Sequence, residues 1–301
     1  MEIRTLRYFL AVAREGNMTR AAGGLHVTQP TLSKALRALE DELGKRLFTR
    51  HSFSISLTEE GALLRDRAEN LLLMVDKIEQ EFLSLDEVMG GDLYLGLAES
   101  YQIRYLAREI KRLKDRYPDL RYHITSGDTE QVTEGLDKGL LDFAVLCGLP
   151  NERKYEHLLF PEADYFGLVM RKDDCLAGRE GIRVGDLVGL PLFCSKQSWE
   201  GDIRPWAKER FGELRLEGSF RLAYNGSVFV KEGLGYLLAL DGLVDTSSES
   251  GLVFRPLSPA LEVPLCLAWG RRQTLTPIAK RFLDQLRAVF AVCGREDHFA
   301  P

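Results

Sequence analysis

The chain has 301 residues, of which 45% are hydrophobic and 28% are charged. This length predicts about two domains of ~100–200 residues each, and the composition is that of an ordinary globular protein rather than a disordered or collagenous chain. No run of ~18 apolar residues is present, and the segment after Met1 lacks a basic head followed by an apolar stretch, so we expect neither a membrane helix nor a secretory signal. The formal net charge of -5 argues weakly against nucleic acid as a partner.

The charge is distributed unevenly along the chain. Residues 1–58 contain nine Lys or Arg and five Asp or Glu, whereas residues 59–301 contain 31 basic and 40 acidic residues. A local basic segment can bind phosphates whatever the total charge of the protein is. An accident of surface charge would give the same excess, so the arrangement of the residues has to decide between the two interpretations.

The five cysteines show no C-x-x-C pair and no neighbouring histidine pair: Cys147, Cys175, Cys194, Cys266 and Cys293. Such spacing disfavours a structural zinc site. An odd number of cysteines without a secretory signal predicts reduced thiols in a cytoplasmic protein, most of them small core residues. We therefore expect no metal and no cofactor.

The first 58 residues read as three short helices joined by tight turns. An apolar face at helical spacing marks the first helix. Thr19 is expected to cap a second helix over Arg20–Leu25, and Thr28 is expected to cap a third that runs to about Leu43. The predicted second and third helices are separated by only a short turn.

The third predicted helix has two unlike faces. On a wheel of 100° per residue, one side is apolar and carries Leu32, Ala35, Leu36 and Leu39. The opposite side carries short polar side chains and two cations: Gln29, Pro30, Thr31, Ser33, Lys34 and Arg37. Pro30 is tolerated because backbone N–H groups in the first turn have no intrahelical partner. A face of this kind suits a groove lined by phosphates and base edges.

A short helix, a tight turn and a cationic second helix form the helix-turn-helix arrangement, in which the second helix enters the major groove of DNA. Residues 50–58 follow, alternating polar and apolar like a small β-wing. The ordered series through residues 4–61 resembles the DNA-binding head of LysR-type transcriptional regulators. The motifs that carry the resemblance are Thr19-Arg20-Ala21-Ala22, residues 25–34, Leu36-Arg37-Ala38-Leu39-Glu40, Leu47-Phe48-Thr49-Arg50 and residues 57–61.

The resemblance implies a winged helix-turn-helix domain over residues 1–58 that binds double-stranded DNA. The residues it places on bases and phosphates are Thr19, Thr28, Gln29, Pro30, Thr31, Ser33, Lys34, Arg37 and Arg50. Two features depart from the family pattern. Gly23 and Gly24 lie inside the second helix, where each glycine costs ~1 kcal/mol relative to alanine. The wing at His51-Ser52-Phe53-Ser54 lacks the arginines common there, which leaves its contact with DNA open.

The segment from Thr58 to about Leu85 reads as one long helix with an apolar or small residue at every third or fourth position. An unbroken heptad series of this kind predicts a two-helix seam, whereas a helix packed on its own domain would show a broader stripe. We therefore expect residues 59–88 to form a dimerisation helix. The seam residues are Leu64, Ala68, Leu71, Val75, Ile78, Phe82 and Leu85. Two symmetry-related heads would then read an inverted-repeat operator.

After a hinge expected at Met89-Gly90-Gly91, strand-like and helical runs alternate, which predicts a parallel α/β sheet. In the second half we expect a strand at Val184–Leu187 and a helix near Trp199–Phe211. The resemblance implies a periplasmic-binding-protein-like effector domain over residues 89–301. Its lobe I would span about 92–162 and 265–295, and lobe II about 163–264.

The expected fold is therefore an α+β multidomain protein. It combines an N-terminal winged helix-turn-helix, a long linker helix and a C-terminal two-lobed α/β effector domain.

Small molecules bind at the carboxyl ends of strands in such sheets, where helix N-termini offer free N–H groups. The residues expected there, which in the family line the cleft for a small inducer, are Glu99, Ser100, Tyr101, Ser126, Thr129, Cys147, Ser195 and Asn225. Ser100, Thr129 and Ser195 are equally compatible with plain helix caps. Glu99 would repel a carboxylate unless it is paired or turned away, so the charge of the ligand stays open.

No HExxH, GxSxG or P-loop pattern is present, and we expect a regulator rather than an enzyme. The predicted function is sequence-specific DNA binding that is switched by a small-molecule effector held between the two lobes. The resemblance also implies a homodimer through the linker helix, a homotetramer and contact with RNA polymerase. Two alternatives remain: a metabolite-binding or catalytic α/β protein whose N-terminal helices serve assembly alone, and a constitutive regulator without a physiological ligand.

Overall fold

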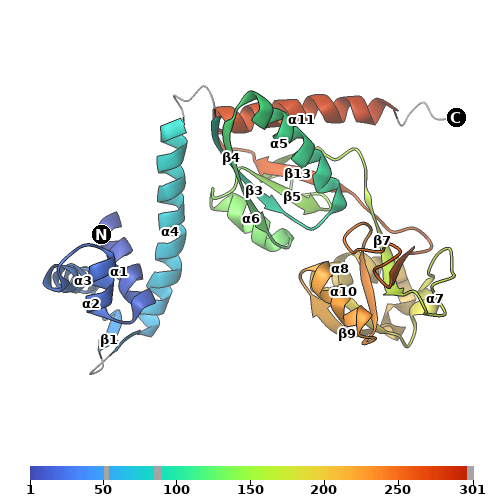
Figure 1. The fold of residues 1–301 in the computed structure, drawn as a ribbon, viewed down its shortest axis with the longest axis horizontal. Helices are drawn as coiled ribbons and strands as arrows, with labels where there is room; N and C mark the ends of the chain where they lie inside the picture. The colour runs from blue at the N-terminus through green and yellow to red at the C-terminus, as the bar shows by residue number, and fades with distance from the viewer. Residues whose placement is uncertain (51–53, 85–89, 297–301) are drawn as a thin grey trace. The chain divides into compact units, whose positions relative to one another are not determined.

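The computed structural model describes residues 1–50, 54–84 and 90–296. Contacts divide the chain into two compact units, Met1–Leu83 and Ser84–Pro301 (Figure 1). Within the described ranges, no helix is both long and apolar enough to cross a membrane.

The first unit begins with three short helices: α1 (Ile3–Glu15), α2 (Met18–Gly24) and α3 (Gln29–Leu43). Asn17 caps α2 by accepting hydrogen bonds from the backbone N–H groups of Thr19 and Arg20, so the prediction that Thr19 caps this helix is wrong. Thr28 caps α3 as predicted and accepts from Thr31 N. The turn between α2 and α3 places His26 at a φ of 55°, a left-handed conformation that most side chains avoid.

The three helices pack around one apolar core. Leu32, Leu36 and Leu39 of α3 are each at most 2% exposed and contact the same cluster as Phe9 and Val12 of α1. Burying a side chain of this size contributes roughly 1.5–3 kcal/mol. The burial of this face fixes the rotation of α3 and turns its polar face outward.

A buried carboxylate connects α3 to the hairpin β1 (Phe48–Arg50) and β2 (Ile55–Leu57). Glu40 is 6% exposed, and its Oε1 accepts hydrogen bonds from the N–H groups of Leu47 and Phe48 at 2.8 and 3.3 Å. Arg46 lies 3.2 Å from Oε2. Glu40 therefore sets the path of the chain into the hairpin, a role that the sequence pattern did not indicate. The predicted wing residues His51, Ser52 and Phe53 lie outside the described residues.

The long helix α4 (Glu59–Ser84) starts against the hairpin. Thr58 Oγ1 accepts from Gly61 N and donates to the carbonyl oxygen of Arg46. A Cβ on Gly61 would lie 2.1 Å from the carbonyl oxygen of Leu47, so the absence of a side chain permits this close approach.

The second unit contains two lobes, each built on one sheet. Lobe I has a five-stranded sheet of order β4-β3-β5-β13-β6. Its elements are β3 (Gly90–Leu97), η1 (Tyr101–Ile103), α5 (Arg104–Arg116), β4 (Asp119–Ser126), α6 (Thr129–Asp137), β5 (Phe143–Cys147), β6 (Tyr155–Leu159), β13 (Leu265–Gly270) and α11 (Pro277–Glu296). The expected parallel pairing holds for β4, β3 and β5. Strand β13 is antiparallel to both neighbours because it returns from the other lobe.

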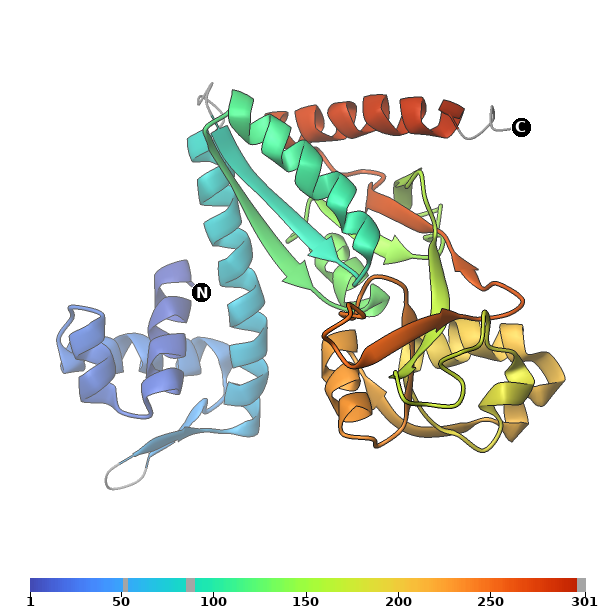
Figure 2. The ribbon, with the colours of Figure 1, turned by 45° about the vertical axis from the view of Figure 1, so that its right-hand side comes forward.

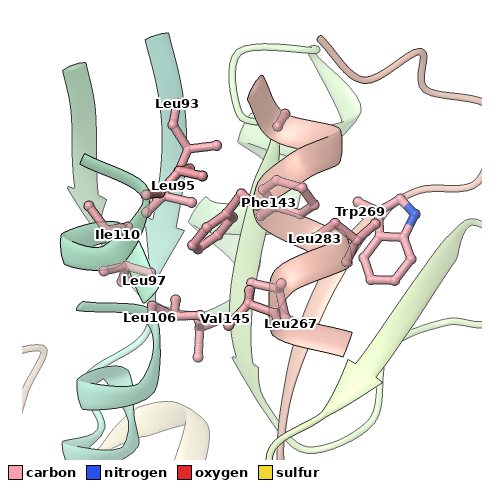
Figure 3. Packing of buried hydrophobic residues seen from close by; sticks show 14 of the residues in the cluster. Leu93, Leu95, Leu97, Leu106, Ile110, Phe143, Val145, Leu267, Trp269 and Leu283 are labelled. Atoms are coloured by element: carbon pink, nitrogen blue, oxygen red, sulfur yellow. The ribbon is translucent and has the colours of Figure 1, made fainter. Parts of the chain in front are cut away.

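Helices cover both faces of the lobe I sheet. On one face α5 and α11 pack against the strands, and Figure 3 shows Leu106, Leu95, Phe143 and Leu283 within this cluster. On the other face α6 packs on β5 and β13. The sheet is thus buried between two helical layers.

Gly90 and Gly91 are not a hinge, in contrast to the prediction. Both belong to β3, where they pair with Asp119 and Leu120 of β4. A Cβ on Gly90 would lie 2.6 Å from the carbonyl carbon of Asp119. The glycine therefore allows close strand contact, and Met89 lies outside the described residues.

Lobe II has a six-stranded sheet of order β11-β7-β10-β8-β9, with β12 paired to β7. Its elements are β7 (Asp164–Arg171), α7 (Val184–Leu187), β8 (Pro191–Ser195), α8 (Lys196–Ser198), η2 (Trp199–Ile203), α9 (Arg204–Ala207), η3 (Lys208–Glu213), β9 (Arg215–Phe220), α10 (Ala223–Lys231), β10 (Tyr236–Leu240), β11 (Leu252–Pro256) and β12 (Glu262–Val263). Helix α10 packs on one face of this sheet, and α7 and the segments between β8 and β9 pack on the other.

Two predictions for lobe II are wrong. The expected strand Val184–Leu187 is a helical turn, in which Leu187 is buried against the sheet. The expected helix over Trp199–Phe211 is broken into the short segments η2, α9 and η3. Pro205 lacks a backbone N–H and limits the helix at this point.

The chain passes between the two sheets twice, from β6 to β7 and from β12 to β13 (Figure 2). Asp164 lies on these crossing strands, opposite Val263. Its side chain is fully buried, and in the part of the chain that the structure describes neither carboxylate oxygen accepts a well-formed hydrogen bond. Burial raises the pKa of Asp164 to about 6, and Ser100 and Gln102 offset only part of this effect.

Replacing Gly61 with alanine is expected to lower the free energy of unfolding of the first unit by ~1–3 kcal/mol, because the added methyl group meets the Leu47 carbonyl. Gly23→Ala is the matched control, since nothing lies within 4 Å of its added Cβ. It should stabilise α2 by up to ~1 kcal/mol. Urea denaturation followed by circular dichroism measures both, and equal effects of the two changes would contradict the close contact at Gly61.

Asp164→Asn is expected to stabilise the second unit at neutral pH. The folded-state pKa of Asp164 lies near 6, above its ordinary value of 3.8. The stability contributed by the protonated carboxyl is therefore present below about pH 4 and lost as the pH rises through 6. We expect the free energy of unfolding of Asp164→Asn to exceed that of the natural protein by about 3 kcal/mol at pH 7.5 and to approach it below pH 4. Denaturation curves across this range test the change, and a difference independent of pH would refute it.

Candidate functional site

The outward face of α3 forms the first candidate site. Thr28, Gln29, Pro30, Thr31, Lys34 and Arg37 are exposed, and Ser33 is half-buried. The hydroxyl oxygens of Thr28 and Thr31 lie 2.8 Å apart, so these two side chains are held together at the start of the helix. The face therefore presents hydroxyl, amide and cationic groups on one rigid element.

The two cations of this face carry charge that the protein does not neutralise. Within the described ranges, neither Lys34 nor Arg37 has a hydrogen-bond or ion-pair partner. They stand three residues apart, so their side chains lie on the same side of α3. Glu40, the next acidic residue, points inward to the hairpin backbone. An anionic polymer could therefore approach α3 without breaking existing ion pairs.

Two further predicted contact residues lie outside α3. Thr19 is exposed at the start of α2. Its neighbour Arg20 donates to the carbonyl oxygen of Glu15 at 2.7 Å. The backbone of Arg50 ends β1, but its side chain lies outside the described residues.

An apolar stripe along α4 forms the second candidate site. Leu71, Ile78 and Phe82 are 40%, 44% and 69% exposed in the single chain, and Val75 is half-buried. Exposed large apolar side chains on one helix face are unusual in a monomer.

The other predicted seam residues lie elsewhere. Ala68 is 2% exposed and packs with Leu6 of α1 and Leu72, and Leu64 lies partly buried against the same cluster. They therefore contact the helices of their own chain. Leu85 lies outside the described residues.

A cleft of about 930 Å³ between the lobes of the second unit forms the third candidate site. It is bounded by the carboxyl ends of β3, β4 and β5 from lobe I and of β8, β9 and β10 from lobe II. Four of the eight residues predicted for an effector line it: Glu99, Thr129, Cys147 and Ser195. The rule that ligands bind at strand ends thus located this cleft.

The remaining four predicted residues are not brought into the cleft. Ser100 is buried and caps η1 by accepting from Gln102 N. Tyr101 is exposed and stacks against the Arg104 guanidinium, 4.7 Å from its ring centroid. Ser126 is exposed at the end of β4, and Asn225 lies on an exposed face of α10. One residue along a strand or turn changes the direction of a side chain, which explains these errors.

Several residues that the sequence reasoning missed line the cleft: Phe166, Lys196, Gln197, Ser198, Ser219, Phe220, Arg221 and Leu240. Lys196 and Gln197 directly follow β8, and Arg221 directly follows β9. The strand-end rule applied to every strand of lobe II would have found these polar residues. The apolar residues gave no signal, because their alternation resembles that of any buried strand.

The electrostatics of the cleft resolve the conflict noted for Glu99. Its Oε2 accepts a hydrogen bond from Ala223 N at 2.7 Å, so its charge is satisfied at the first turn of α10. Asp128 is likewise engaged, because it caps α6 by accepting from Gln131 N. Lys196 and Arg221 have no ion-pair or hydrogen-bond partner among the described residues. The uncommitted charge in the cleft is therefore mainly positive.

The thiols near the cleft are held in the protonated form. Burial raises the pKa of Cys147 and of Cys266 to about 12, and raises the pKa of Cys194 further. A protonated thiol is a weak nucleophile and a weak metal ligand. In the part of the chain that the structure describes, no group of three metal-ligating side chains is found.

Comparison with known proteins matches both units. Residues 3–62 match the bacterial regulatory helix-turn-helix proteins of the lysR family, and residues 87–291 match the LysR substrate binding domain. The chain is 35% identical over 194 residues to the hydrogen peroxide-inducible genes activator of Pectobacterium carotovorum subsp. carotovorum, an alignment that spans 64% of each protein. It is 30% identical over 302 residues to the Hca operon transcriptional activator HcaR of Escherichia coli (strain K12), covering 94% of this chain and 96% of HcaR.

The fold also matches a solved structure. Full-length CbnR complexed with its target DNA aligns with a TM-score of 0.74 at 22% identity, covering 96% of this chain and 99% of that one. The expected fold class is thereby confirmed: a helix-turn-helix unit followed by an α/β substrate-binding domain. The chain belongs to the LysR family of bacterial regulatory helix-turn-helix proteins.

Proposed function

We propose that this protein is a sequence-specific DNA-binding transcriptional regulator that is switched by a small molecule bound in the cleft of its second unit. The observation that carries the proposal is the exposed face of α3 with its two unneutralised cations, Lys34 and Arg37. HcaR, which aligns over nearly the whole chain, is a transcriptional activator. Such a regulator acts in the cytoplasm, where bacterial DNA lies.

The proposed binding mode places α3 in the major groove. Gln29, Thr31 and Ser33 are suited to base edges, since amide and hydroxyl groups both donate and accept hydrogen bonds. Lys34 and Arg37 are suited to phosphates or to guanine. Thr19 and Thr28 stand at helix starts, Pro30 lies in the first turn of α3, and the backbone of Arg50 ends β1. The exposure of α3 supports these contacts, and CbnR, whose fold this chain shares, has been solved in complex with its target DNA.

Lys34→Ala and Arg37→Ala are each expected to weaken binding to an operator duplex about 10-fold and to lower the salt dependence by about one released counterion. The folded state should be unaffected, because both side chains are exposed. Arg67→Ala on α4 is the matched control, since it removes the same charge from an exposed position of the same unit. Fluorescence anisotropy at several salt concentrations measures the effect. Equal operator affinities for the natural protein and the three variants would contradict the assignment of α3 as the DNA-binding helix.

We further propose that α4 pairs with its counterpart in a second copy. Leu71, Val75, Ile78 and Phe82 recur on one side of the helix and lie outside the core of the chain's own head. Removing this stripe from water would stabilise a dimer. A dimer of DNA-binding heads would read an inverted repeat. Pairing of the second units would then give a homotetramer. RNA polymerase would be a further partner of this assembly.

Phe82→Asp is expected to weaken dimerisation at least ~10-fold, because it places a charge in the apolar seam. Leu73→Asp is the matched control: Leu73 is 56% exposed but lies about 200° around the helix from Leu71. Sedimentation equilibrium of the full-length variants measures the dissociation constant. An unchanged dissociation constant for Phe82→Asp would show that α4 does not form the dimer interface.

For the effector we propose a small apolar or aromatic acid. Phe166, Phe220 and Leu240 offer apolar surface in the cleft, and Lys196 and Arg221 offer uncommitted positive charge. The chemistry of the cleft does not favour a response to peroxide, which the name of one relative describes. The cleft thiol Cys147 is protonated at neutral pH, and peroxide reacts with thiolates.

A further inference from the structure

Two sets of hydrogen bonds join the lobes directly across the cleft. Glu99 of lobe I accepts from the N–H of Ala223 in lobe II. Gln197 of lobe II accepts from the N–H of Thr129 in lobe I at 3.1 Å and donates to the Thr129 hydroxyl at 2.9 Å. In both cases a side chain of one lobe reaches the first residue of a helix in the other lobe.

The bond from Glu99 fills a structural need of α10. The residue before this helix, Leu222, provides no side-chain acceptor for the first N–H groups. A helix N-terminus attracts negative charge, because its N–H groups point outward and the helix dipole adds to them. The Glu99 carboxylate therefore supplies from the opposite lobe the cap that the local sequence lacks.

The same position is where an anionic ligand would bind if Glu99 were absent. Ala223 and Glu99 both line the cleft, as do Lys196 and Arg221. A carboxylate tethered in the same chain competes with a dissolved one at high effective concentration. An incoming acid therefore finds the end of the cleft at α10 occupied by Glu99. The cations Lys196 and Arg221 remain available to bind it.

We infer that Glu99 is a specificity-determining residue of the cleft, a built-in anion that holds α10 and directs the single acidic group of the effector to Lys196 and Arg221. This inference rests on the proposed function and deepens it. The natural cleft favours a monocarboxylate, because the second acidic group of a dicarboxylate would have to displace Glu99. Displacing Glu99 would also break the bond between the lobes.

Hydrogen exchange of the full-length protein, without DNA or acid, tests the bond itself. Glu99→Ala should speed exchange of the amides at residues 223–225 at least 10-fold, whereas Glu99→Gln retains an acceptor and should change it less. Glu130→Ala is the matched control. It removes an exposed acid from the lining of the same cleft, and its side chain has no partner within the described ranges. Unchanged exchange in Glu99→Ala would overturn the inference.

Titration calorimetry with benzoate and terephthalate tests the specificity. The ratio of terephthalate to benzoate affinity should rise about 10-fold in Glu99→Ala relative to the natural protein, rise less in Glu99→Gln, and stay constant in Glu130→Ala. A constant ratio in all variants, or no binding of either acid to any of them, would overturn the role of Glu99 in ligand choice. Binding of operator DNA by the same proteins is a separate readout. Its absence would refute the proposed function while leaving the exchange result intact.

Discussion

The sites of this protein depend on how the first backbone N–H groups of its helices are satisfied. Each helix start needs acceptors that the helix itself cannot provide. Thr28 and Asn17 supply them locally in the first unit, which lets α2 and α3 form from their own sequence. In the second unit Glu99 supplies them to α10 from across the cleft. The same constraint thus builds a rigid recognition helix in one unit and ties two lobes together in the other.

The distribution of charge follows a similar division. Glu40 of α3 is turned inward by hydrogen bonds to the hairpin backbone, so it does not neutralise Lys34 and Arg37 on the outer face of the helix. In the cleft, Glu99 and Asp128 are bound at helix starts, which leaves Lys196 and Arg221 available together with one exposed acid, Glu130. In both places the protein engages an acid internally and leaves two bases open to a partner. A net charge of -5 for the whole chain conceals this arrangement.

The first unit could be predicted closely, because its signals are local. The apolar spacing of Leu32, Leu36 and Leu39 and the cap at Thr28 lie within a few residues of each other, and α3 forms as expected. The cap of α2 was missed because Asn17 and Thr19 both suit an N-cap, and only the backbone decides between them. The lobes were predicted more coarsely. Val184–Leu187 forms a helical turn because it has no neighbouring strand among the described residues to pair with, and the sequence pattern does not show this. Gly90 reads as flexible in the sequence, although its backbone is held in β3.

The sequence by itself determined the helix-turn-helix unit, the long helix and the alternation of strands and helices, because these follow from periodicities of a few residues and from capping side chains. Only the tertiary structure decided which side chains share the cleft. Glu99 and Ala223 are 124 residues apart, and Thr129 and Gln197 are 68 apart. Contacts at such separations depend on how two sheets are connected by crossing strands, and no local pattern encodes that geometry.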